Sequence, residues 1–98
     1  MLPNGVQVEI RGRVQGVGYR AWLAQVAGMF GVRGWVRNRH DGWVEAVLIA
    51  EEADRLEPVL AMIHRGPEAA RVEDVATRPL DEDETAGIAA GFEVRPDA

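Results

Sequence analysis

The sequence predicts a single α+β domain over residues 1–98, with an antiparallel sheet and two helices packed on one of its faces. Three observations lead to this fold class. Apolar and polar residues alternate in several short segments, as they do in strands with one buried face. In two longer segments the apolar residues recur at helical spacing. The elements follow one another in the order βαββαβ, without an internal repeat or linker, and a short strand closes the chain.

The first half of the chain is expected to form three strands and one helix. These are strands over residues 5–13, 32–39 and 43–50, and a helix over residues 21–30. Gly31 is a suitable residue for ending the helix, because glycine readily takes the left-handed conformation that follows a helix. Asp41 and Gly42 form the Asp-Gly pair that is typical of a hairpin turn between the second and third strands.

The second half is expected to form a helix over residues 52–65, a strand over residues 71–78, and a closing strand around Phe92 and Val94. Val72 and Val75 break strict alternation, which indicates a β-bulge. Residues 80–90, LDEDETAGIAA, are expected to form an acidic loop with no core pattern. The complete order is that of the ferredoxin-like fold, in which an antiparallel sheet carries two helices on one face. This fold hosts many activities and does not by itself identify one.

The composition is that of an ordinary folded domain of 98 residues, with 47% hydrophobic and 28% charged residues. The absence of cysteine excludes disulfides and thiolate chemistry. The N-terminal sequence MLPNGVQVEIRG has no apolar run typical of a signal peptide, and no stretch is long enough to span a membrane. We therefore expect a cytoplasmic protein without a membrane partner.

Charge is distributed unevenly along the chain. Residues 1–40 carry +5 and residues 41–98 carry −10, for a net charge of −5. A positive N-terminal half favours the capture of a small anion. An acidic protein is a poor ligand for nucleic acid, because binding to nucleic acid requires many cationic contacts with phosphates, so no nucleic-acid partner is expected.

The most informative segment is GRVQGVGYR, which runs from Gly12 to Arg20 between the first strand and the first helix. Gly16 and Gly18 allow the backbone to turn so that several N–H groups point to one anion. The helix that follows adds its unpaired N–H groups and the positive end of its dipole. Arg20 adds a planar cation that can bind two phosphate oxygens. The segment is either a cradle for a small phosphate or a turn that serves only packing, and it matches neither a Walker loop nor a dinucleotide fingerprint.

GRVQGVGYR, together with GWVRNRHDGWVEA at residues 34–46, RGP at 65–67 and GFEVR at 91–95, strongly resembles the acylphosphatase family over nearly the whole chain. The resemblance implies a ferredoxin-like fold and the hydrolysis of acyl phosphates to a carboxylate and inorganic phosphate. It places the catalytic arginine at Arg20 and the asparagine that positions the attacking water at Asn38. The phosphate-binding residues implied in the same way are Gln15, Gly16, Val17, Gly18, Tyr19 and Arg20. Tyr19 stands where many relatives have phenylalanine.

The chemistry of this reaction fits the residues that are present. Phosphoryl transfer depends mainly on positioning and on stabilising the charge of the phosphate oxygens. A carboxylate leaving group has a conjugate acid with a pKa of about 4, so that no general acid is needed to protonate it. Asn38 can accept a hydrogen from water and donate one to the phosphate. We therefore expect no metal and no cofactor, with inorganic phosphate as both product and competitive inhibitor. The protein is also expected to be a monomer.

Other prominent residues are interpreted more simply. His40 and His64 are isolated from further metal-ligating residues in the sequence, and are expected to be exposed. Trp22 fits the core face of the first helix, whereas Trp35 and Trp43 fit packing on the sheet surface. Two further arginines, Arg13 and Arg37, are expected to be solvated strand residues. The acidic run at 81–84 lacks the pattern of a calcium loop and is expected to be solvated.

Two alternatives are weighed against a free-standing hydrolase. A similar domain begins the large carbamoyltransferases of hydrogenase maturation, where carbamoyl phosphate is the substrate. The cysteines of a zinc finger would follow such a domain, and the sequence contains none. The second alternative is an RNA-binding module with the same order of elements. It would need aromatic residues on its central strands and a basic face, but the first strand has no aromatic residue and the protein is acidic.

Overall fold

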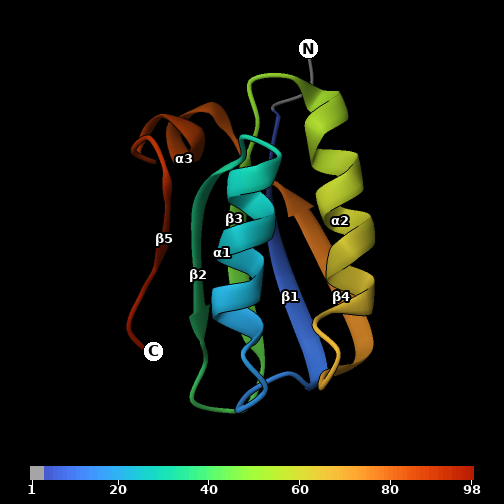
Figure 1. The fold of residues 1–98 in the computed structure, drawn as a ribbon. Coiled ribbons are helices and arrows are strands. Elements are labelled where there is room, and N and C mark those ends of the chain that lie inside the picture. The colour runs from blue at the N-terminus through green and yellow to red at the C-terminus, as the bar shows by residue number, and fades with distance from the viewer. Residues whose placement is uncertain (1–3) are drawn as a thin grey trace.

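A five-stranded sheet with two long helices forms the computed structural model, which describes residues 4–98 (Figure 1). The expected domain of residues 1–98 includes residues 1–3, which lie outside the described part. The strands are β1 (Gly5–Arg13), β2 (Arg33–Asn38), β3 (Val44–Ile49), β4 (Arg71–Pro79) and β5 (Phe92–Val94). The helices are α1 (Tyr19–Met29), α2 (Leu56–Arg65) and α3 (Glu82–Ala86), and a 3₁₀ turn at Ala53–Arg55 precedes α2.

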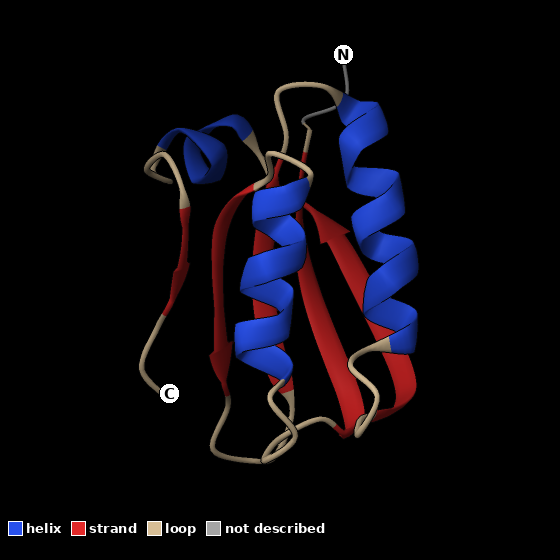
Figure 2. Ribbon diagram, in the orientation of Figure 1, coloured by secondary structure: helices blue, strands red, loops and turns tan. Residues whose placement is uncertain are grey.

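The strand order is β4-β1-β3-β2-β5, and α1 and α2 cover the same face of this sheet (Figure 2). The first four strands are antiparallel neighbours, as predicted. β5 differs, because it adds to the free edge of β2 in a parallel orientation and makes the sheet mixed. The ferredoxin-like α+β class is thus confirmed, while the expectation of a purely antiparallel sheet fails at this edge pair.

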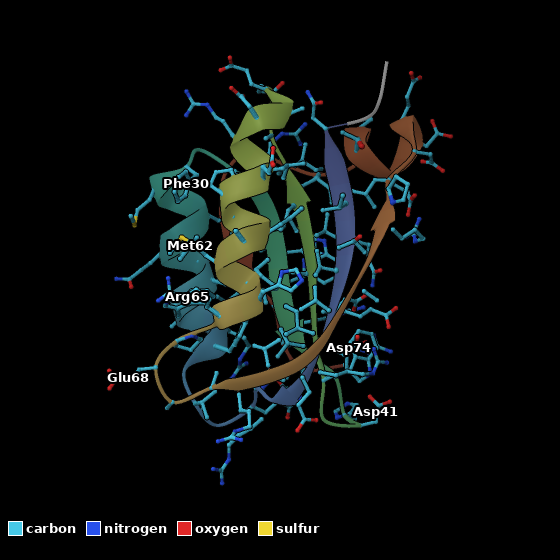
Figure 3. The ribbon with its side chains drawn as sticks, turned by 90° about the vertical axis from the view of Figure 1, so that its right-hand side faces the viewer. Phe30, Asp41, Met62, Arg65, Glu68 and Asp74 are labelled. Atoms are coloured by element: carbon cyan, nitrogen blue, oxygen red, sulfur yellow. The ribbon has the colours of Figure 1, made fainter. Side chains whose placement is uncertain are left out.

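Apolar side chains form two clusters, one on each face of the sheet. The larger cluster fills the space between the sheet and the two long helices, and includes Val8, Ile10, Leu23, Val36, Leu48, Val59 and Ile63. The smaller cluster lies on the opposite face and consists of Trp35, Val47, Ile49 and Leu80, with Ile88 packed against it. Seen from the side, α1 and α2 lie to one side of the sheet and α3 to the other (Figure 3).

The expectation of an acidic loop without a core pattern over residues 80–90 is therefore wrong. Leu80 is buried and Ile88 packs beside it. The intervening α3 begins with a capping box, in which the Asp81 carboxylate accepts from the Glu84 N–H and the Glu84 carboxylate accepts from the Asp81 N–H. A helix of five residues is too short to show a helical period, but its capping box is visible in the sequence as Asp-x-x-Glu.

The remaining boundaries lie close to those predicted. α1 begins two residues earlier than expected, and it ends as predicted with Gly31 in the left-handed region, at a φ of 68°. The Gly31 N–H donates to the Gly28 carbonyl and the Val32 N–H to the Ala27 carbonyl, which is the Schellman arrangement. The predicted bulge is confirmed, because the register between β1 and β4 shifts at Arg11 and Gly12. The predicted second helix is split into the 3₁₀ turn and α2.

Candidate active site

A cavity of about 290 Å³ opens where α1 begins. The start of α1 lies at the end of the sheet that also carries the β2–β3 connection (Figure 1). Its lining residues are Val14, Gly16, Gly18, Tyr19, Arg20, Ala21, Asn38 and Val94. The fold thus brings Arg20, from the first turn of α1, to the same cavity as Asn38, the last residue of β2. These are the two residues for which the sequence suggested a catalytic role.

The loop that leads into α1 depends on two glycines. Gly16 has a φ of 75° and Gly18 a φ of 78°, which is the left-handed region that residues with a side chain rarely adopt. A Cβ atom at either position would meet no other atom within 4 Å. Glycine is therefore required here by the backbone conformation and not by crowding, and the space in front of the loop is open.

The start of α1 presents unpaired backbone donors to this space. Gly18 is the N-cap residue and provides no side-chain cap, and the first turn contains no acidic residue. The first helical hydrogen bond of α1 runs from the Trp22 N–H to the Gly18 carbonyl. Within residues 4–98, the N–H groups of residues 16–21 have no backbone acceptor. A helix N-terminus with several free N–H groups is a favourable binding site for an anion.

Arg20 lies at the edge of this group of donors, where its charge is opposed by the helix dipole. The only ion pair recorded for it within residues 4–98 is with Asp97, in which Nη1 of Arg20 lies 3.1 Å from Oδ1 of Asp97. Both side chains are solvent-accessible, with exposed fractions of 39% and 51%. The guanidinium therefore reaches solvent beside the cavity and can approach a bound anion.

Asp97 reaches Arg20 because the C-terminal segment continues along β2 after β5 ends. The Arg95 N–H donates to the Val36 carbonyl, and the Ala98 N–H donates to the Asn38 carbonyl. The His40 N–H then donates to a carbonyl oxygen of Ala98. The role of Asp97 could not be predicted from the sequence, because no local pattern links a residue of this segment to Arg20, 77 positions earlier.

Asn38 is the one buried polar residue in the described part of the chain, with 7% of its surface exposed. It pairs with Val44 across the hairpin, and its carbonyl holds the C-terminal segment. Its side-chain Oδ1 is buried and has no hydrogen-bond partner within residues 4–98. A buried acceptor without a partner is costly, and at the wall of a cavity it is available to a water molecule or a ligand.

Three of the predicted phosphate-binding residues use their side chains elsewhere. Gln15 does not line the cavity, and its Nε2 donates to the carbonyls of Arg39 and Trp43 at 2.8 and 2.9 Å. Gln15 therefore ties the loop to the β2–β3 hairpin. The Val17 side chain packs against the main apolar cluster. The Tyr19 side chain is buried, so that only its backbone can face a ligand at the loop of residues 15–20.

The Tyr19 hydroxyl donates to the Ile63 carbonyl in α2 at 2.7 Å. This carbonyl lies four residues before Pro67, which has no N–H with which to bond it, and the tyrosine supplies the missing donor. Gly66 makes room for the ring, since a Cβ there would lie 2.9 Å from Cε2 of Tyr19. Burial raises the pKa of the Tyr19 phenol well above its usual value. Gly66 and Pro67 of the RGP segment thus accommodate the hydrogen bond that joins the start of α1 to the end of α2.

The two histidines and Arg37, which the sequence also made prominent, do not line the cavity. His40 and His64 are exposed, as expected. The Arg37 side chain bonds Glu45 at 2.8 Å and stacks on Trp35, on the face of the sheet opposite the long helices. Within residues 4–98, no group of three or more histidine, cysteine or acidic residues is placed to hold a metal ion. No helix in the same residues has the length and apolarity needed to cross a membrane.

Comparison with known proteins gives consistent matches. The model of the family described as Acylphosphatase matches residues 6–94. A protein named Acylphosphatase from Rhodopseudomonas palustris (strain ATCC BAA-98 / CGA009) is 62% identical over 69 residues, which are 70% of this chain and 69% of the relative. Acylphosphatase 2 of Ralstonia nicotianae is 48% identical over 91 residues, which are 93% of this chain and 92% of that relative. The crystal structure of acylphosphatase from Bacillus subtilis superposes with a TM-score of 0.84 at 29% identity, covering 97% of this chain and 99% of that one.

Proposed function

Because the chain belongs to the acylphosphatase family, we propose that it hydrolyses acyl phosphates to a carboxylate and inorganic phosphate in the cavity at the start of α1. The observation that carries this proposal is the arrangement of three features around one small cavity. These are the free N–H groups of the glycine loop, the Arg20 guanidinium, and the unpaired Oδ1 of Asn38.

In this proposal the phosphoryl group of the substrate lies in the loop of residues 15–20. The backbone N–H groups donate to its oxygens, and the start of α1 favours the negative charge. Arg20 donates two hydrogen bonds to the same group and balances the charge on its oxygens as the reaction proceeds. Gln15 and Tyr19 contribute indirectly, because their side chains fix the loop to the hairpin and to α2.

Asn38 positions the attacking water. Its Oδ1 accepts a hydrogen bond from the water, and the amide N–H₂ is available to donate to a phosphate oxygen. The water oxygen forms a bond to phosphorus while the bond from phosphorus to the acyl oxygen breaks, and the carboxylate leaves with the electron pair of that bond. The water gives its proton to solvent or to the departing phosphate. Alignment of water, phosphorus and leaving oxygen is the main contribution of the protein to this step.

The chemistry requires neither a metal nor a general acid, because a carboxylate is a stable leaving group. The inorganic phosphate that is formed occupies the same donors as the substrate phosphoryl group, so it acts as a competitive inhibitor. We propose that the protein works as a single domain, a monomer in the cytoplasm, without a nucleic-acid or membrane partner. The relatives at 48% and 62% identity are named as acylphosphatases, which favours the hydrolase over the carbamoyltransferase-type and RNA-binding alternatives.

The test is to incubate the purified protein with benzoyl phosphate, carbamoyl phosphate and a phosphate monoester, each with excess chelator. Hydrolysis of benzoyl phosphate without metal and little action on the monoester are expected, because an alkoxide is a far worse leaving group than a carboxylate. Inorganic phosphate should inhibit competitively. Activity that chelator abolishes and magnesium restores would contradict the metal-independent mechanism, and transfer of the carbamoyl group without net hydrolysis would favour the alternative.

A further inference from the structure

One wall of the cavity is an uncovered apolar side chain. Val94 of β5 has 47% of its surface exposed, and it is one of two large hydrophobic residues in residues 4–98 that are exposed to this degree. The other is Met29, at the opposite end of α1 and outside the lining of the cavity. An exposed valine alone needs no explanation. An exposed valine in the same small cavity as Arg20 and Asn38 does.

The exposure of Val94 follows from its position in the sheet. Val94 pairs with the fully buried Val36, so both side chains point to the face that the long helices cover. Phe92, two residues earlier on β5, lies on the same face and packs against the main apolar cluster. Val94 lies beside the first turn of α1, where the helix and its cover come to an end. Nothing in the described part of the chain covers the methyl groups completely.

The register also fixes the distance between Val94 and Asn38, the proposed water site. Asn38 lies two residues beyond Val36 on the neighbouring strand. From an interstrand spacing of about 4.8 Å and a rise of about 3.3 Å per residue, the Cα atoms of Val94 and Asn38 are separated by about 8 Å. A phosphoryl group with an oxygen on either side fits a span of this order. With the water held at Asn38, in-line attack directs the leaving acyl group away from Asn38, and Val94 is the large exposed hydrophobic residue in the cavity lining.

We infer that Val94 is the contact surface for the acyl group, and that the site favours acyl phosphates whose acyl group is apolar over those with a polar group, such as carbamoyl phosphate. This inference rests on the proposed hydrolase function and specifies its substrate class. The phosphate half of the substrate is bound by charge and hydrogen bonds, which are the same for every acyl phosphate. Selectivity among acyl phosphates must therefore come from contacts with the acyl group, and an apolar side chain gains from contact only with an apolar partner.

The experiment measures kcat and KM for acetyl, butyryl, benzoyl and carbamoyl phosphate, together with the inhibition constant for inorganic phosphate. The proteins compared are the wild type, Val94→Ala, Val94→Thr and the control Met29→Ala. Val94→Ala removes the contact, and Val94→Thr keeps the shape while replacing a methyl group with a hydroxyl. Circular dichroism and the melting temperature of each variant confirm that it is folded.

For the wild type, KM should fall from acetyl to butyryl and benzoyl phosphate. Val94→Ala and Val94→Thr should raise KM for benzoyl and butyryl phosphate about threefold or more, a modest effect because the cavity is open. KM for carbamoyl phosphate and the inhibition constant for phosphate should stay at their wild-type values, and Met29→Ala should match the wild type throughout.

If the Val94 variants changed KM equally for all four substrates, or did not change it, the assignment of Val94 would be overturned while the hydrolase function stood. A wild-type protein that hydrolyses none of the four substrates would refute the proposed function and this inference with it.

Discussion

Arg20, which lines the cavity, forms an ion pair with Asp97, which does not, with 3.1 Å between Nη1 and Oδ1. The two residues come from the start of α1 and from the segment that follows β5. If a phosphoryl group binds at the loop of residues 15–20 as proposed, it shares the Arg20 guanidinium with this carboxylate. The pair therefore connects Arg20 to the C-terminal segment, and mutation of Asp97 tests its effect on the proposed anion binding.

Asp97→Asn should tighten the binding of inorganic phosphate, because the charge of Arg20 is then no longer partly neutralised. For an exposed ion pair the expected decrease in the inhibition constant is about two- to fivefold at low ionic strength. The difference from wild type should shrink at about 1 M salt, where exposed charges are screened. Asp54→Asn makes the same change in the 3₁₀ turn at the other end of the sheet, and serves as the control (Figure 1). An inhibition constant that rises would mean that Asp97 acts mainly by holding Arg20 in position.

Arg20→Gln should nearly abolish turnover. By analogy with arginine residues that stabilise phosphoryl transfer, the expected loss of rate is about 10³- to 10⁵-fold. Inhibition by phosphate should weaken as well. Arg20→Lys should restore little of the activity, because lysine cannot make a bidentate contact with the phosphate. Arg11→Gln is a matched control, since Arg11 is an arginine of similar exposure paired with Glu9 outside the cavity. If Arg20→Gln retains more than about a tenth of the activity, far above the expected range, the assigned role is wrong.

Asn38→Ala should lower kcat and leave the affinity for inorganic phosphate near its wild-type value, because the loop N–H groups and Arg20 supply most of the phosphate binding, whereas the orientation of the water matters in the transition state. Loss of one well-placed polar group costs about 10²- to 10³-fold in rate in other enzymes. Asn38→Asp should also lower kcat, since it places a negative charge beside an anionic substrate. Asn4→Ala, which removes a hydrogen bond to the Glu51 carbonyl far from the cavity, is the control. Weakened phosphate binding with an unchanged kcat would identify Asn38 as a binding residue.

The capping box of α3 should give stability a dependence on acidic pH. The hydrogen bond from Arg78, followed by that from the Asp81 N–H, lowers the pKa of Glu84 from 4.5 to about 2. A carboxyl group whose pKa is lowered by folding contributes stability above its unfolded pKa and loses it as the pH falls through the folded value. Glu84→Gln should therefore slightly lower the melting temperature at pH 6, and the difference should fade between pH 4.5 and about 2. Glu82→Gln on the same helix is the control, and a difference that persists at pH 2 would contradict this account.

The parts of the fold that depend on local residue patterns could be predicted from the sequence. Alternation in β1 and the periodic apolar residues of α2 directly reflect which face is buried, and both elements were predicted within a few residues. Gly16 and Gly18 likewise signalled the turn before α1, since their left-handed conformations are a local property. The β-bulge was visible for the same reason, as a break in alternation.

Features that depend on distant parts of the chain were not predictable in this way. The direction of β5 relative to its neighbour depends on which of the two sheet edges, β4 or β2, it joins, and three residues carry no information about that choice. The contact of Asp97 with Arg20 and the placing of Val94 in the cavity both follow from this parallel pairing. The buried position of Leu80 was missed because its partners Trp35 and Val47 lie on strands formed much earlier in the chain.

The hydrogen bond from Tyr19 to Ile63 makes the loop at the start of α1 observable by optical titration. The chain contains a single tyrosine, so the absorbance of phenolate at alkaline pH has only one source. Burial raises the pKa of this phenol, and stability is accordingly lost as the pH rises above the unfolded value of about 10. Ionisation of Tyr19 removes the proton that its hydroxyl donates to the Ile63 carbonyl, and so breaks this hydrogen bond between α1 and α2. The alkaline absorbance of this protein thus follows the contact between the start of α1 and the end of α2, behind the loop of residues 15–20.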